Sequence, residues 1–385
     1  MKVLMIAPTP FFADRGCHIR IYEEVMGLQS LGHEVLVCTY GLGRDVDGVK
    51  TIRTINFPWY HKLSAGPSKT KILLLPFLLL TTLRTIRIFK PDVIHAHLHE
   101  GACIARVCRL FYPRKKYLFD MQGGLVQETV QHGFVKEKGL GYIFLSKLEK
   151  AITKWQFIIV SSRNMEEELN EMGLQKKRYL NVMDGVDIEL FRPEKPDEDL
   201  VKRYGLSEKS FCLVFVGLLE EYQGIDILLD AFKLVLDTIP EAVLIICGYP
   251  NEDYYKNKCK NLGILNKVHF VGRVEYLDLH RYLSLGQIAI APKISVTEGN
   301  GKIYNYLAMG LPTIAFNTEV NREIMGDAGL YVEEKSDVTL ANKIIWAYNN
   351  QDYCKNVCKM ARKRAENKLS NIMMARKIER VYRRL

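Results

Sequence analysis

The sequence lacks a long apolar run and a signal peptide. Its longest apolar stretch, residues 72–80, has about half the length that a membrane-spanning helix needs, and Pro76 interrupts it. The first residues, MKVLMIAPTP, begin a strand pattern at once and have neither the apolar core nor the cleavage site of a secretory leader. We therefore expect no transmembrane helix and a cytoplasmic protein.

The cysteines form no framework of pairs. There are nine, an odd number, and most lie inside apolar runs, as reduced and buried thiols do. Cys354 and Cys358 are four residues apart but have no histidine at ligand spacing. The sequence thus predicts no zinc site and no other metal centre.

No motif for reading nucleic acid accompanies the positive charge. The formal charge of +10 and the pI of about 9.0 favour polyanionic partners, which include nucleic acids, anionic lipids and phosphorylated substrates. Zinc-finger spacing, an aromatic RNP-like strand and a basic zipper are all absent, and the basic residues mostly spread along the chain. We expect no nucleic-acid partner.

Short apolar runs alternate with segments of helical period, which is typical of parallel sheets with crossover helices. The stretch DGVDIELFRPEKPDEDL interrupts this alternation with two prolines and clustered acids, and the alternation then restarts. We predict an α/β protein with two doubly wound Rossmann-like domains that face each other across a cleft, residues 1–190 and 191–365, followed by a basic helix at 366–385. The expected strands are residues 3–7, 35–38, 93–96, 117–120 and 157–161 in the first domain and 211–216, 242–247, 267–271, 288–291 and 313–316 in the second.

Ligands of such sheets bind beyond the carboxyl ends of the strands, so residues just after the strands are site candidates. Arg15 and Gly16 follow the first strand and lead into a helix. A glycine lets a ligand approach the backbone closely, and a helix N-terminus offers unpaired amides to a phosphate. An ordinary turn is the alternative for this pair.

Three histidines alternate at the end of a later strand, in DVIHAHLHEG. On one strand, His95, His97 and His99 would share a face and could bind a metal. We expect instead that His99 lies in a loop and that a single polar histidine faces the cleft. A hydrogen-bonded histidine without a function is the alternative.

Two glycine-containing turns of the second half precede helices. FVGLLEEYQG places Gly217 at a strand end and Gln223 just before a helix. The second turn combines flexible glycines, a cation and a helix start, and such a combination can hold a diphosphate. Its residues are Glu298, Gly299, Asn300, Gly301 and Lys302.

The order and spacing of several segments resemble the retaining glycosyltransferases of family four, which have the GT-B fold. The resemblance runs from about residue 1 to residue 334. It is carried by GHEVLVCTY, PDVIHAH, DGVDIELFRP, VFVG, YQGIDILLDAF, VHFVG and NYLAMGLPTIAF.

The resemblance implies that the second domain binds a sugar nucleotide and that the first domain binds the acceptor. It places Gly16 at the donor diphosphate and gives catalytic positions to His97, near the transferred sugar, and Glu298, at the sugar hydroxyls. Transfer with retention requires that the charge of the departing diphosphate is stabilised. The resemblance implies neither a metal nor a cofactor beyond the sugar nucleotide.

The sequence departs from the family pattern at the donor site. The Arg and Lys that usually grip the donor phosphates correspond to Leu218 and Gln223, which carry no charge. Asn305 stands where the family has a second carboxylate that holds the ribose hydroxyls. We expect Lys302 and Arg15 to supply the missing positive charge and Asn305 to bind the ribose.

The predicted function is therefore transfer of a sugar from a nucleotide-diphosphate sugar to a glycan or lipid-linked acceptor, with retention of the anomeric configuration. A noncatalytic nucleotide-sugar sensor or partner subunit is the alternative, because the same departures would fit a protein that binds without turnover. A sugar-nucleotide epimerase is a third hypothesis, and it would turn over donor without acceptor.

One segment of the first domain suggests a membrane surface. Residues 69–90, KTKILLLPFLLLTTLRTIRIFK, join a strongly apolar stretch to basic residues, and Arg114, Lys115 and Lys116 add a second cationic cluster. These groups could hold the protein peripherally on an anionic membrane beside a lipid-linked acceptor. A buried helix with a basic end is the alternative.

Overall fold

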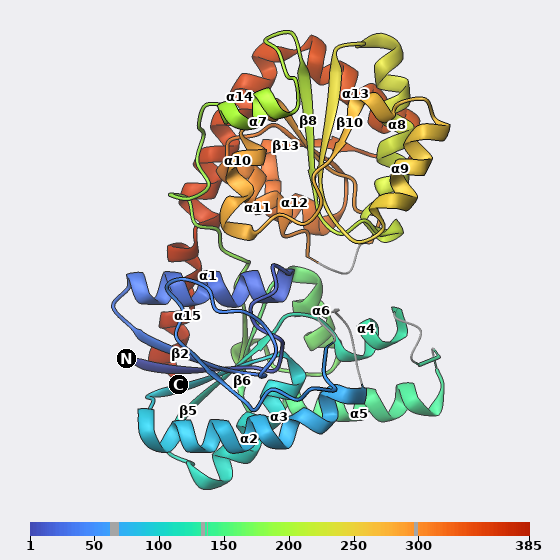
Figure 1. Cartoon of the computed structure of the whole chain (residues 1–385). Helices are drawn as coiled ribbons and strands as arrows, with labels where there is room; N and C mark the ends of the chain where they lie inside the picture. Colours follow the sequence, from blue (N-terminus) through green and yellow to red (C-terminus); the bar gives the residue numbers. More distant parts are fainter. Residues whose placement is uncertain (62–68, 132–134, 137, 296–298) are drawn as a thin grey trace. The chain divides into compact units, whose positions relative to one another are not determined.

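The computed structural model describes residues 1–61, 69–131, 135–136, 138–295 and 299–385. The chain forms two compact units, Met1–Gly185 together with Asn371–Leu385, and Val186–Ser370. It therefore leaves the first unit after Gly185 and returns to it after Ser370 (Figure 1). The expected division at residues 190 and 191 lies close to the first crossing, but the return of the chain was not foreseen.

Within the described residues, the first unit has a seven-stranded sheet in the order β3-β2-β1-β4-β5-β6-β7, and all its strand pairs are parallel. Every residue of the central strand β4 is buried, which explains why such strands appear in the sequence as continuous apolar runs. The strands are β1 (Lys2–Ala7), β2 (Glu34–Thr39), β3 (Thr51–Arg53), β4 (Val93–His97), β5 (Lys116–Met121), β6 (Phe157–Val160) and β7 (Tyr179–Asn181).

Helices cover both faces of this sheet. Helices α1 (Gly16–Ser30) and α15 (Asn371–Arg384) lie on one face, and α2 (Lys69–Phe89), α3 (Leu98–Phe111) and α5 (Leu140–Thr153) lie on the other (Figure 1). Apolar side chains of α2 and α3 pack with those of β1, β2 and β4 in one buried cluster. The shorter helices of this unit are α4 (Leu125–Gln131) and α6 (Arg163–Glu171).

The last helix, α15, packs along α1 in the first unit. Met374, Ile378, Val381 and Tyr382 are buried in this contact, and Gly27 on α1 has no side chain that would collide with Asn371. From the sequence we predicted a basic helix at 366–385 beyond the second domain, whose charged residues would be solvated. In the structure, the charged residues of α15 cover only its outer face, while the apolar ones belong to the core of the first unit.

The second unit, as far as it is described, has a six-stranded sheet in the order β10-β9-β8-β11-β12-β13, again with parallel pairs only. Its strands are β8 (Phe211–Val216), β9 (Ala242–Cys247), β10 (Val268–Phe270), β11 (Ile288–Ala291), β12 (Thr313–Phe316) and β13 (Gly329–Val332). Its helices are α7 (Glu198–Arg203), α8 (Ile225–Thr238), α9 (Glu252–Asn261), α10 (Leu279–Leu283), α11 (Lys302–Ala308), α12 (Glu319–Met325), α13 (Asp337–Asn349) and α14 (Gln351–Arg364), which continues into a π-helical turn at Ala365–Leu369.

The predicted α/β fold with two doubly wound Rossmann-like units is confirmed. All ten expected strands are present, with ends that differ by at most two residues from the prediction. The nine cysteines all lie in the described part of the chain and are free thiols there. Among the described residues, no helix combines the length and the hydropathy that crossing a bilayer requires.

Candidate functional site

His97 is the last residue of β4, and the register of the sheet places it opposite Asp120 on β5. Its Nδ1 lies 3.0 Å from Oδ2 of Asp120, and both side chains are fully buried. Because a carboxylate accepts this hydrogen bond, Nδ1 carries the proton and Nε2 is left as the acceptor of the ring. Nε2 is buried as well and has no hydrogen-bond partner among the described residues.

Asp120 is held as a carboxylate by Arg20 of α1. Arg20 donates from Nε to Oδ2 and from Nη2 to Oδ1, both at 2.9 Å. Burial alone would raise the pKa of Asp120, but the guanidinium and the hydrogen bond from His97 hold that pKa well below its usual range. The charged Asp120 therefore fixes both the tautomer and the orientation of His97.

Further groups tie this arrangement to the rest of the first unit. Arg20 also donates to Oδ1 of Asp184 at 2.6 Å. Glu24, one turn along α1, lies 3.2 Å from Nε of Arg20, yet burial and the nearby Asp120 raise the pKa of Glu24 well above its usual range. Among the carboxyl groups around Arg20, burial therefore favours the protonated form of Glu24, whereas the guanidinium favours the charged form of Asp120.

His95 connects the cluster to the C-terminal helix. Its ring stacks on that of His97 with 4.5 Å between centroids, and Nδ1 lies 2.8 Å from the Tyr382 hydroxyl on α15. Burial, followed by the effect of His97, lowers the pKa of His95 well below its usual value. A neutral His95 is therefore a packing and hydrogen-bonding residue behind His97.

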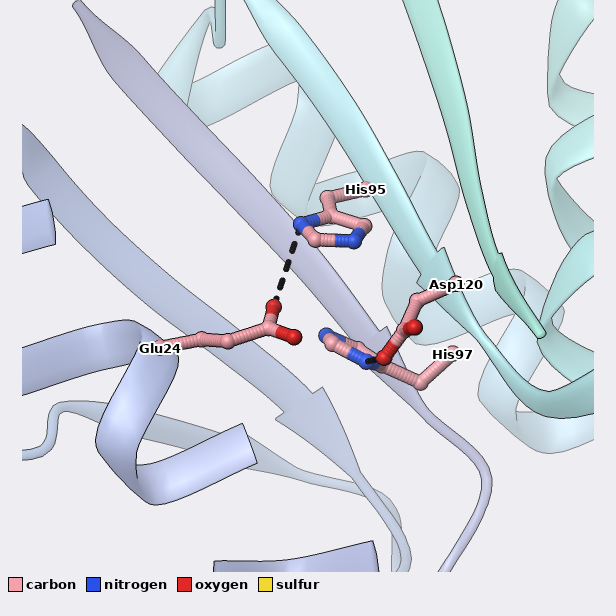
Figure 2. Close-up of side chains that lie close together, drawn as sticks. All are labelled: Glu24, His95, His97 and Asp120. Atoms are coloured by element: carbon pink, nitrogen blue, oxygen red, sulfur yellow. Dashed lines mark hydrogen bonds and ion pairs between the residues drawn. The ribbon is translucent and has the colours of Figure 1, made fainter. Parts of the chain in front are cut away.

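Figure 2 shows how Glu24, His95, His97 and Asp120 converge, with one ligand-type atom of each within 4.8 Å of the others. Such a group could bind a metal, but Arg20 already contacts both carboxylates. A metal ion would have to displace this guanidinium, so we assign the cluster to the positioning of His97.

The third histidine of the motif lies elsewhere. His99 is in the first turn of α3 rather than in the expected loop, and its Nε2 lies 3.0 Å from Oε1 of Glu149 on α5. The set of three histidines that the sequence analysis considered is therefore divided between two environments.

Arg15 and Gly16 stand at the start of α1, directly after the loop that follows β1. A Cβ added to Gly16 would meet no atom within 4 Å, so the space in front of this backbone is open. The Nε of Arg15 is buried without a hydrogen-bond partner among the described residues. The position suits a ligand, and the assignment of both residues to the donor diphosphate stays a prediction.

In the second unit, three of the predicted donor-site residues meet at the end of β8. Lys302, the first residue of α11, donates from Nζ to Oε1 of Gln223 at 2.7 Å. Gly217 has φ +147°, and a Cβ at this residue would lie 2.8 Å from Nζ of Lys302, so only glycine leaves room for the ammonium group. These contacts gather Gly217, Gln223 and Lys302 into one group.

The charge of Lys302 has no counterpart in the described part of the chain. Lys302 is half-buried, and its Nζ lies 4.3 Å from the centroid of the Phe215 ring. No described carboxylate lies within ion-pair distance of it. Burial, followed by the repulsion of Lys293, lowers the pKa of Lys302 well below its usual value, which is the response of a cation without an anion.

The remaining residues of the glycine turn have different surroundings. Gly299 is exposed, and its carbonyl accepts from Nζ of Lys293 at 2.9 Å. Asn300 is buried and donates to Oδ1 of Asn321 at 3.1 Å, while its own Oδ1 has no partner among the described residues. Gly301 precedes α11 in open space. Glu298, the second predicted catalytic residue, lies outside the described residues.

Asn305 is buried on α11, one turn after Lys302, and donates from Nδ2 to the Tyr276 hydroxyl at 3.3 Å. A contact between Asn305 and a ribose stays a prediction, and Tyr276 is the neighbour of Asn305 in the structure.

Several site residues were not predicted from the sequence, namely Tyr276, Lys293, Arg20, Glu24 and Asp120. Only Asp120 could have been found, because it ends a predicted strand next to that of His97.

Comparisons with known proteins identify the family to which both halves of the chain are similar. Residues 196–364 match the family model "Glycosyl transferases group 1", and residues 15–190 match "Glycosyltransferase Family 4". EpsD of Bacillus subtilis, whose name assigns it to the glycosyltransferases, is 26% identical over 294 residues, which cover 73% of this chain and 74% of EpsD. The uncharacterized glycosyltransferase MJ1607 of Methanocaldococcus jannaschii is 25% identical over 401 residues, which cover 100% of this chain and 98% of MJ1607.

The fold has a close counterpart among solved structures. Alr3699/HepE of Anabaena, in a complex with UDP and glucose, superposes with a TM-score of 0.79 at 16% identity, and the match covers 100% of both chains. At this identity the likeness is one of fold.

Proposed function

The chain belongs to the group 1 glycosyltransferases with the GT-B fold, and from this premise we propose that it moves a sugar from a nucleoside-diphosphate sugar to a glycan or lipid-linked acceptor. We further propose that transfer proceeds with retention of the anomeric configuration and needs neither a metal nor a cofactor other than the sugar nucleotide. The structure of HepE with UDP and glucose supports a nucleoside-diphosphate donor, since that neighbour has the same fold.

The uncompensated charge of Lys302 is the observation that carries this proposal. A half-buried ammonium group without a described carboxylate is unfavourable unless an anion joins it. The phosphate oxygens of a nucleoside diphosphate supply that charge, and Gln223 and Gly217 leave Nζ in place for them. Lys302 would thereby replace the Arg and Lys that the family has at the positions of Leu218 and Gln223.

In the proposed mechanism, His97 contributes from the first unit. His97 would contact the transferred sugar once its buried ring becomes accessible to the donor, while Asp120 keeps Nδ1 protonated and Arg20 keeps Asp120 charged. Glu298 would hold the sugar hydroxyls, and Asn305 the ribose. These proposed roles require that the two units face one another across a cleft, with Arg15 and Gly16 next to the diphosphate of the donor.

Isothermal titration of Lys302→Ala with a nucleoside diphosphate and with the corresponding nucleoside tests the donor site. Loss of a hydrogen bond to a charged group should cost about 1.5 to 3 kcal/mol of diphosphate affinity and leave nucleoside binding almost unchanged. Lys359→Ala on α14 is a matched control, because this lysine is exposed in the same unit. An equal loss for both ligands, or no loss for either, would reject Lys302 as the phosphate ligand.

A noncatalytic sensor of nucleotide sugars is the second candidate, and the uncharged Leu218 and Gln223 favour it. Incubation of the protein with UDP-, GDP- and ADP-sugars and a cell extract as acceptor source separates the two. Release of nucleotide that depends on acceptor supports the transferase, whereas binding without release supports the sensor. Conversion of the donor into another sugar nucleotide without acceptor and without net release of nucleotide would indicate the epimerase.

A further inference from the structure

Within the described residues, the first unit exposes sixteen large apolar side chains and the second unit eight. Most of those in the first unit lie on one layer of three helices that are separate in the sequence, α2, α3 and α5. The most exposed on these helices are Leu80 (64%), Ile88 (70%), Leu110 (78%), Phe111 (65%), Leu140 (87%) and Phe144 (66%).

These three helices present one common surface. Helix α3 contacts both α2 and α5, and all three lie on the same face of the sheet (Figure 1). Arg106 and Arg109 of α3 donate to the carbonyls of Ala151 and Trp155 and so fasten α3 to the end of α5. The inner sides of the helices pack on the sheet, so their exposed side chains point away from it. We call this surface the α2–α3–α5 face.

The apolar side of helix α5 faces away from the core of the first unit. Leu140, Ile143, Phe144 and Leu148 recur at the spacing of one helical stripe, and all four are exposed. Glu149 points inward instead, where it accepts from the backbone amide of Leu125 at 2.6 Å. A stable helix in water shows the opposite arrangement, so the stripe is suited to an apolar environment outside the fold.

The charges on the α2–α3–α5 face are almost all positive. The three helices contain eight basic residues and two acidic ones, Glu100 and Glu149, of which Glu149 is buried. Arg84, Arg87 and Lys147 are among the exposed basic residues beside the apolar stripes. Over the whole first unit the formal charge is +13, against −3 for the second unit.

We propose that the α2–α3–α5 face binds an anionic lipid bilayer, with the apolar stripe of α5 entering the boundary between headgroups and acyl chains. An apolar stripe flanked by basic side chains is the pattern of a helix that lies in the plane of a membrane. Residues 69–90 and 114–116 were predicted from the sequence, and the structure adds α5, on which Leu140 is the most exposed large apolar side chain of the described residues.

The positive charge decides between a membrane and a second copy of the chain. Two α2–α3–α5 faces brought together would oppose basic residues to basic residues, which like charges disfavour. Anionic headgroups meet the same residues with the opposite charge, and each basic residue near such a surface contributes to binding. The inference does not depend on the transfer reaction, because adsorption requires neither nucleotide nor acceptor.

Flotation of the full chain with vesicles tests the proposal. At low salt, vesicles of phosphatidylcholine with phosphatidylglycerol should carry the protein, and pure phosphatidylcholine should carry far less. The double variant Leu140→Ser/Phe144→Ser and the double variant Lys147→Glu/Lys150→Glu should each lower partitioning about tenfold or more. The matched controls in the second unit, Val338→Ser and Lys359→Glu, should partition like the unchanged chain.

Circular dichroism of each variant confirms that it is folded before flotation. Absence of binding to anionic vesicles would overturn the proposal, as would equal partitioning of the α5 variants and the controls. Self-association in analytical ultracentrifugation that the α5 substitutions abolish would also overturn it, because a second copy would then occupy the face. A loss of sugar transfer with intact partitioning would count against the proposed function alone.

Discussion

Arg20 in the first unit and Lys302 in the second are both cations removed from water, but their surroundings differ. Arg20 contacts Asp120, Asp184 and Glu24 within the fold. Lys302 contacts an amide oxygen and an aromatic ring and has no described carboxylate beside it. A buried cation that is paired with carboxylates stabilises the fold. A buried cation without a carboxylate partner indicates a place where an anionic ligand binds.

The largest expected effect is a difference in the free energy of unfolding between variants of these two cations. Arg20→Met should destabilise the protein by about 3 to 5 kcal/mol, because it removes the cation that compensates the buried charge of Asp120. Lys302→Met should change the free energy of unfolding by no more than about 1 kcal/mol, since no anion loses its partner. Urea denaturation of both variants measures the difference. Equal losses would mean that both cations are structural.

The next effect concerns His97, which the cluster around Arg20 orients. His97→Ala should lower turnover about 100-fold and leave donor affinity almost unchanged, because the interaction is made mainly in the transition state. Asp120→Asn should reproduce part of this loss by favouring the wrong tautomer. Steady-state rates and donor titrations with the same preparations provide the measurement, and full activity of His97→Ala would refute the assignment.

A smaller effect is the pH dependence of donor binding. Burial lowers the pKa of Lys302 in the free protein, and a bound diphosphate should raise it again. Above the lowered pKa, binding must therefore take up a proton, and affinity should fall as the pH rises through that value. Titration calorimetry in two buffers of different ionisation enthalpy measures the uptake. Lys302→Ala should abolish it, and unchanged uptake in that variant would assign the proton to another group.

The smallest expected effect lies at the edge of the His97 cluster. Tyr382→Phe removes the hydroxyl that pairs with Nδ1 of His95 and should cost about 1 kcal/mol of stability. Its effect on turnover should be well below that of His97→Ala, because Tyr382 acts only through His95. A turnover loss as large as that of His97→Ala would make α15 part of the catalytic apparatus.

Sequence patterns predicted the interior of both sheets well but missed three of the four described edge strands. The nine predicted interior strands are fully or largely buried runs, whereas the missed strands β3, β7 and β13 are edge strands of three or four residues each. The edge strand β10 was predicted although it is short and half-exposed. Edge strands are half-exposed and short, so they lack the continuous apolar run that identifies a central strand. Hydrophobic periodicity therefore predicted the interior strands, which carry the site residues, more completely than the edge strands.

The candidate site shows the same limit at the level of single residues. His97 and Lys302 were predicted because strand ends and glycine turns mark them in the sequence. Arg20 and Glu24 escaped notice, since on a helix of the first unit they have the sequence pattern of an ordinary polar face. Their role depends on pairing with Asp120, about 100 residues later, and only the register of the sheet brings that residue to them.

The two crossings of the chain have a consequence for how the protein is made. Helix α15 covers α1 and supplies Tyr382 to His95, yet its residues are the last of the first unit to leave the ribosome. Until then, the α1 surface around Gly27 stays uncovered while the whole of Val186–Ser370 is synthesised. The nascent first unit therefore stays incompletely folded, and accessible to chaperones and proteases, while the second unit is synthesised. It can be completed only when residues 371–385 have been translated.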